Sequence, residues 1–156
     1  MSVLPPVSAE SIPPTEGSIY PTEFADRTAG RTKRKLGDHF GLRNFGINLT
    51  RLAPGAISAL AHHHATQDEL VYVLEGNPTL LLDGEPHRLQ PGDCHGIRAG
   101  SGVAVQLINE TDQDVVYLEV GDRSRGDRAV YPDEDLLAVM DENGRYRFLH
   151  KDGTPY

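Results

Sequence analysis

The feature that most constrains the fold is a series of short apolar segments between residues 44 and 120, each ended by a turn signal. Several segments alternate apolar and polar residues, the pattern of a half-buried strand. The turn signals are Ala53-Pro54-Gly55, the hairpin motif Asp83-Gly84 and Gln90-Pro91-Gly92-Asp93. Strands are predicted at 44–52, 57–64, 69–74, 79–82, 86–89, 103–109 and 115–120. This spacing favours an all-β barrel or sandwich.

The segments that flank this strand-patterned region differ from it in composition. Residues 1–43 form an N-terminal arm that we expect to be largely irregular, because five prolines interrupt its first half. A basic cluster follows in the arm and indicates either a solvated surface or packing on a neighbouring subunit: Arg27, Arg31, Lys33, Arg34 and Lys35. Residues 122–156 are predicted to pack on the barrel as a C-terminal extension. Within them, 135–140 forms a short strand or a helical turn, and Asn143-Gly144 is a second hairpin signal.

Charge and length exclude several classes of function. A formal net charge of −8 argues against binding to nucleic acid or to an anionic membrane. No apolar run reaches the roughly 20 residues of a membrane span, and the first residues lack a secretion signal. The 156 residues suit one domain, and the single cysteine, Cys94, is assigned to core packing. We therefore expect a soluble, cytoplasmic, single-domain protein.

Three consecutive histidines carry the strongest chemical signal. Alternate side chains of a strand share a face, so His62 and His64 point one way and His63 the other. Glu69 begins the next predicted strand after a short link, and a hairpin return would place its carboxylate beside the two imidazoles. Two histidines and one carboxylate can hold a metal ion on one side and leave its other positions open.

The segment 55–76 resembles the first signature of the cupin superfamily. In that signature a glycine precedes His-x-His, a glutamate follows, and a second glycine lies six residues beyond. The matching residues, with one extra residue after the first glycine, are Gly55, His62, His64, Glu69 and Gly76. The second signature is matched by Gly92, by Arg98-Ala99-Gly100 and by Asn109, with Arg98 in place of the usual proline.

One departure from the family pattern concerns the metal. The fourth ligand of cupins is a histidine four residues before the asparagine, and Val105 stands at that place. Valine cannot ligate, so the resemblance implies three protein ligands. His95 lies on a nearby predicted strand and could substitute, although we expect that it does not. Alternatively the site has decayed, and its imidazoles only line a polar cavity.

The resemblance covers about residues 44–121 and implies a small single-domain cupin of the cupin_2 type. The fold would be all-β, an antiparallel double-stranded β-helix or jelly-roll barrel. It would hold one divalent ion (Fe, Mn, Zn or Ni) through His62, His64 and Glu69.

Two functions from different classes follow from the resemblance. The first is an enzyme acting on a small organic molecule, of the dioxygenase, sugar-phosphate isomerase or epimerase, or decarboxylase type. A phosphosugar would need cations in the pocket, for which Arg51 and Arg98 are the nearest candidates. The second is a non-catalytic binding or sensing module with a degenerate metal site. A weaker hypothesis is a structural subunit that exchanges its arm; a homodimer is expected. The sequence names no catalytic base.

Overall fold

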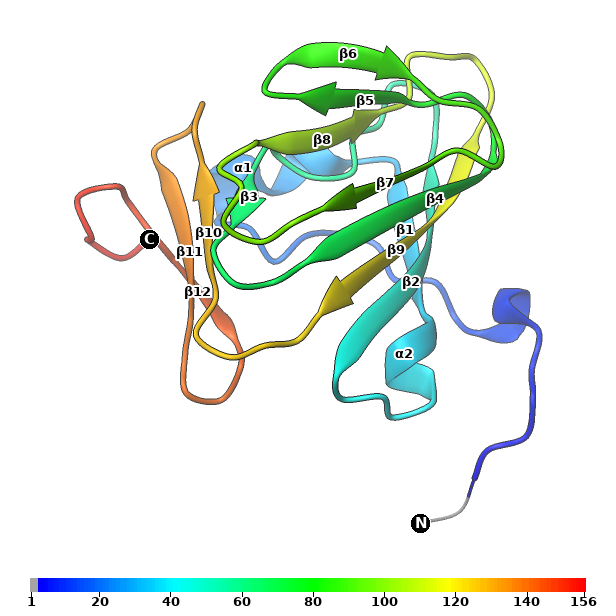
Figure 1. Ribbon diagram of the computed structural model, residues 1–156, viewed down its shortest axis with the longest axis horizontal. Helices are drawn as coiled ribbons and strands as arrows, with labels where there is room; N and C mark the ends of the chain where they lie inside the picture. Colours follow the sequence, from blue (N-terminus) through cyan, green and yellow to red (C-terminus); the bar gives the residue numbers. More distant parts are fainter. Residues whose placement is uncertain (1–2) are drawn as a thin grey trace.

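The computed structural model describes residues 3–156, and its strands form three antiparallel sheets (Figure 1). The largest sheet has the order β1-β2-β9-β4-β7, with the bounds β1 Arg31–Lys35, β2 Phe45–Leu52, β9 Val115–Asp122, β4 Glu69–Glu75 and β7 Cys94–Ile97. The second sheet runs β12 (Tyr146–Leu149), β11 (Leu136–Met140), β10 (Arg128–Tyr131) and β3 (His63–His64). The third consists of β6 (Glu85–Arg88), β5 (Thr79–Leu82) and β8 (Val105–Ile108). The predicted all-β jelly roll is confirmed, although the hydrogen-bonded ladders do not close into one continuous barrel.

Helical structure is confined to single turns. They are η1 (Ala9–Ser11), α1 (Thr22–Ala25), η2 (Asp26–Thr28) and α2 (Leu36–His39). None of the helices in the part of the chain that the structure describes has the length and apolar character needed to span a membrane.

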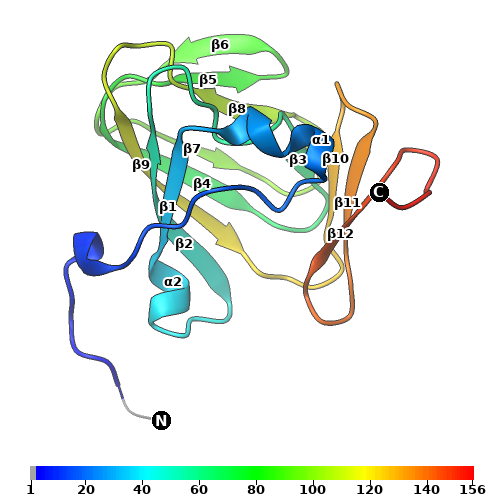
Figure 2. The same ribbon diagram turned by 180° about the vertical axis from the view of Figure 1, so that it is seen from behind.

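The N-terminal arm contains a strand that the sequence did not predict. Figure 2 shows the arm crossing from β1 toward the second sheet, where α1 turns the chain back. β1 then pairs along β2 in register from Arg31↔Leu52 to Lys35↔Asn48. Pairing with β2 turns alternate basic side chains toward the barrel interior, and Lys33 forms an ion pair with Glu119. The interpretation of the basic cluster as a solvated surface is therefore wrong for Arg31 and Lys33, whereas Arg27 and Lys35 are exposed.

The predicted strand over 57–64 is only partly formed. Ile57 and His62 make isolated bridges to β8, and only β3 continues as a ladder, now against β10. Between the bridges, the Ser58 hydroxyl accepts a hydrogen bond from the Leu107 amide, and the Gln106 side chain donates to the Ala59 carbonyl. Side chains thus replace part of the ladder, and the segment changes from one sheet to the next.

Of the two structures predicted for residues 135–140, the strand is the one that forms, as β11. β11 pairs with β12 from Leu137↔Leu149 to Met140↔Tyr146, and the turn between them contains Gly144 with φ +77°. The hairpin predicted at Asn143-Gly144 is therefore confirmed. With β10 and β3, this hairpin builds one wall of the barrel.

Two apolar cores stabilise the barrel. The first fills its interior, and its buried members are Leu52, Ala56, Val71, Leu80, Val105, Leu107, Val115 and Tyr117. The second lies between the arm and the second sheet, where Phe24 and Tyr20 pack with Leu60, Tyr131 and Leu136.

Cys94 belongs to neither core. It stands opposite Tyr72 in the β4–β7 ladder, and both side chains are exposed because they share the outer face of the sheet. The prediction of core packing for Cys94 is wrong.

We expect Gly76→Ala to destabilise the protein strongly. Gly76 has φ +79°, and a Cβ there would lie 2.6 Å from the Asp114 carbonyl oxygen and 2.9 Å from Val115 Cγ2. Strain and overlap together should lower the free energy of unfolding by about 3 kcal/mol. Gly144→Ala is the matched control, since Gly144 has φ +77° and open space, and should cost about 1 kcal/mol. Equal losses for the two variants in urea denaturation would contradict the steric argument.

Candidate metal centre

The structure brings together the three residues that the sequence selected. Ligand atoms of His62, His64 and Glu69 all lie within 4.8 Å of one another. His64 Nε2 is 3.5 Å from Glu69 Oε1, and the two imidazole centroids are 5.0 Å apart. The imidazoles come from the short β3 region and the carboxylate from the start of β4, so two walls of the barrel meet here. His63 points away and does not line the cavity.

Hydrogen bonds fix which nitrogen of each imidazole faces the centre. His62 Nδ1 lies 2.6 Å from the Leu60 carbonyl oxygen, which can only accept, so this nitrogen carries the proton. His64 Nδ1 lies 2.5 Å from Asp127 Oδ2 and donates in the same way. Both Nε2 atoms are then left as lone-pair donors directed at the centre, as metal ligands require.

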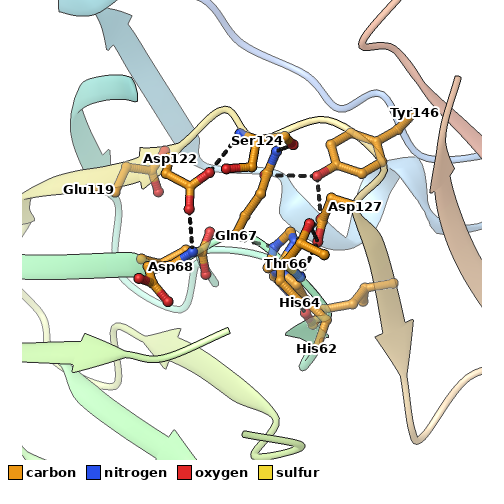
Figure 3. A network of polar contacts seen from close by, with 12 residues as sticks. His62, His64, Thr66, Gln67, Asp68, Glu119, Asp122, Ser124, Asp127 and Tyr146 are labelled. Carbon is orange, nitrogen blue, oxygen red and sulfur yellow. Dashed lines mark hydrogen bonds and ion pairs between the residues drawn. The ribbon is translucent and has the colours of Figure 1, made fainter. Parts of the chain in front are cut away.

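Asp127 supports the site from behind (Figure 3). Its buried carboxylate also accepts hydrogen bonds from the Tyr146 hydroxyl at 2.6 Å and from the Thr66 amide at 2.9 Å. Burial by itself would raise the pKa of Asp127, but the bonds from Tyr146, His64 and Thr66 outweigh it and hold the pKa at about 2. An ionised carboxylate behind an imidazole orients the ring and increases its basicity.

Aromatic rings cover the other side of the histidines. Tyr131 stacks on His62 with centroids 5.2 Å apart, and Tyr20 of the arm meets Tyr131 edge-on at 5.7 Å. The Leu60 amide donates to the Tyr20 hydroxyl at 3.3 Å. Because of this enclosure, burial and then the adjacent His64 lower the pKa of His62 to about 4. His62 is consequently a neutral ligand candidate at ordinary pH.

The pKa of Glu69 is shifted in the opposite direction from that of His62, although burial disfavours the charged form of both side chains. Burial raises the pKa of Glu69, and the neighbouring His64 only partly offsets the effect. The protein alone therefore stabilises the negative charge of this carboxylate poorly. A cation beside Glu69 would supply the missing counter-charge, which fits a site for a divalent ion.

The cluster opens into a cavity of about 550 Å³. Beside Glu69, the inner faces of β9 and β2 carry Gly121 and Gly46, which stand opposite each other and fill no space. The arm contributes the segment 15–20 to the lining, and β1 contributes the cationic side chains Arg31, Lys33 and Lys35.

The cations expected from the sequence lie elsewhere. Arg51 points to the outer face of β2 and pairs with Asp114, and Arg98 is exposed in a turn. Neither lines the cavity, so both assignments are wrong. The alternation of β1 could have identified its inward cations, had the segment been predicted as a strand.

Comparison with known proteins identifies the family. A model described as a cupin domain matches residues 48–121. A sugar phosphate isomerase from a cupin superfamily, from Silicibacter pomeroyi DSS-3, is 41% identical, with 97% of this chain and 96% of that chain covered and a TM-score of 0.92. The chain belongs to the cupin superfamily.

Other similar structures agree with this membership. A putative sugar phosphate isomerase from Acidithiobacillus ferrooxidans is 30% identical, with 81% of this cupin and 80% of that chain covered and a TM-score of 0.72. The polyketide cyclase RemF from Streptomyces resistomycificus is 20% identical over 76% of this chain and 79% of its own, with a TM-score of 0.60, and shares the fold. No curated protein matches the chain.

The position of the missing fourth ligand is now visible in this cupin. Val105 lies directly across from His62, is buried and lines the cavity, so an apolar side chain occupies the ligand position. His95 shares the inner face with Val71, but it does not join the group of converging donors. Ile97 stands opposite Glu69 instead.

Removing His62 should weaken the acid sensitivity of the cupin. The pKa of His62 is about 4 when folded and about 6.5 when unfolded, so the unfolded chain binds the extra proton first as pH falls. Stability is therefore lost from about pH 6.5 down to pH 4. With EDTA present, wild type should lose about 2 kcal/mol more than His62→Asn between pH 7 and 4.5 in urea titrations. His63→Asn is the control; the same loss in wild type and His62→Asn would contradict the prediction.

Proposed function

We propose that this cupin is a metal-dependent enzyme of the sugar phosphate isomerase type. It would hold one divalent ion, Fe, Mn, Zn or Ni, through His62, His64 and Glu69. The observation that carries the proposal is a converging three-donor cluster in a cavity to which β1 contributes cationic side chains. The similarity to a sugar phosphate isomerase at 41% identity over nearly the whole chain supports it.

The donor set suits the chemistry of an isomerase. A bound divalent ion would act as a Lewis acid toward a substrate carbonyl. Three protein ligands, with Val105 in the fourth position, leave room for two oxygens of a sugar. Tyr131 stacks on His62, Tyr20 packs against Tyr131, and the arm segment 15–20 contributes to the lining of the cavity.

The strand β1 provides the charges that a phosphate requires. The hydrogen bonds of Arg31 go to the Ser58 and Gly17 carbonyl oxygens, and its guanidinium forms no ion pair with a carboxylate within residues 3–156. None of the ion pairs in this range involves Lys35, an exposed residue that also lines the cavity. Two uncompensated cations on one strand of the lining favour an anionic substrate group.

A second candidate function is a non-catalytic binding module. It is favoured by Val105, which removes a donor from the site. Tight binding of a small molecule without any metal would support this alternative. The homodimer, the cytoplasmic location and the division into arm, barrel and extension stay predictions.

Purified protein should contain a divalent ion that depends on the three donors. Joint replacement of His62 and Glu69 by alanine should abolish it, because two of three donors are lost. Asp127→Asn should weaken affinity about 10–100-fold, since His64 loses its ionised partner. Elemental analysis and chelator competition measure both effects, with His63→Ala as the control. Undiminished metal in the double variant would place the ion elsewhere.

Metal-loaded protein should interconvert an aldose phosphate and its ketose phosphate. In a panel of pentose and hexose phosphates followed by proton NMR, Lys35→Gln should raise KM about tenfold with little change in kcat, since it removes one contact to phosphate. Arg51→Gln, on the outer face, is the matched control. Equal turnover of unphosphorylated sugars would contradict the phosphate assignment.

A further inference from the structure

A second carboxylate, Glu119, faces the same cavity from the neighbouring strand. In the β4–β9 ladder Glu69 stands opposite Gly121, and Val71 stands opposite Glu119. Glu69 and Glu119 are therefore diagonal neighbours on one face, with backbones roughly 7–8 Å apart. Gly121 places no side chain between them. A small substrate bound at the metal centre would lie within reach of both carboxylates.

The two oxygens of Glu119 have different surroundings. Oε1 accepts a hydrogen bond from Asn48 Nδ2 at 2.9 Å and forms the ion pair with Lys33 Nζ. Oε2 makes no hydrogen bond to any residue in the described range 3–156. The side chain is thus held by one oxygen, while the other keeps its lone pairs available. Burial tends to raise the pKa of Glu119, but Lys33 and Asn48 outweigh it, and the net pKa is lowered.

The other acidic groups that line the cavity are less suited to proton transfer from a substrate. Glu69 belongs to the metal cluster. Asp122 has both oxygens engaged, by the amides of Asp68 and Ser124. Glu16 is exposed on the arm. Burial keeps the hydroxyl of Tyr131 protonated by raising its pKa, so it can donate but not accept the proton.

We propose that Glu119 is the catalytic base of the isomerisation and that Lys33 and Asn48 are its positioning residues. This assignment rests on the function proposed above. Oε2 takes the proton from the carbon next to the carbonyl, and the electrons of that C–H bond form the C=C bond of an enediol. The carbonyl π electrons move onto the carbonyl oxygen, which takes up the proton that leaves the neighbouring hydroxyl. Oε2 then delivers a proton, exchanged in part with water, to the former carbonyl carbon. No oxidant or reductant is consumed.

Glu119→Gln tests the assignment because it keeps the size and removes the basic oxygen. With the substrate turned over by wild type, kcat should fall at least about 100-fold. Metal content should stay unchanged, and calorimetric affinity for the sugar phosphate should change less than about threefold. Incorporation of deuterium from D₂O into the substrate carbon should fall in parallel. Glu119→Asp, which keeps a carboxylate, should recover part of kcat.

Glu75→Gln is the matched control, since it removes an exposed carboxylate at the end of β4 that does not line the cavity. Wild-type kcat in Glu119→Gln would overturn the base assignment and leave the isomerase proposal standing. Loss of the metal in Glu119→Gln would also overturn the base assignment, because Glu119 would then be needed for metal binding. A metal-loaded wild type that interconverts no aldose and ketose phosphates would overturn both proposals.

Discussion

The hydrogen bond between His64 and Asp127 is the interaction on which the site depends most. Without an acceptor behind it, the imidazole would have no fixed tautomer, and Nε2 would have no fixed direction. Tyr146 and Thr66 hold the acceptor, so the C-terminal sheet and the turn before β4 are joined at one buried carboxylate. A buried charge is tolerated there because every bond it accepts favours the ionised form.

The barrel and the ligand cluster could be predicted from the sequence, but their surroundings could not. Strand alternation and turn chemistry are local properties, so they located most strands and placed His62 and His64 on one face. The position of Glu69 beside the histidines could also be predicted, because only a short link separates them in the sequence. Asp127, Tyr131 and Tyr146 reach the site through long-range pairing of β3 with β10 and of β11 with β12, which no local pattern encodes.

The errors made from the sequence have a common physical origin. The environments of Arg51, Cys94 and the basic residues of β1 were assigned from composition or from neighbours in the sequence. Which way these side chains point is set instead by the strand that pairs beside them. Once β1 pairs with β2, the arm becomes a wall of the cavity instead of a solvated segment. Alternation then decides which of its side chains enter the interior.

The contacts that define the cavity join parts of the chain that are far apart in sequence. His64 and Asp127 are 63 residues apart, Gln67 and Tyr146 are 79 apart, and Leu60 and Tyr20 are 40 apart. Closing such long loops is slow compared with forming hairpins, so the β5–β6 hairpin should form early and the centre late. Intermediates in refolding would then contain barrel strands while their histidines still lack orientation. Recovery of secondary structure should therefore precede recovery of the geometry of the three ligands. A circular dichroism signal alone would overstate the fraction of refolded molecules that can bind a metal ion.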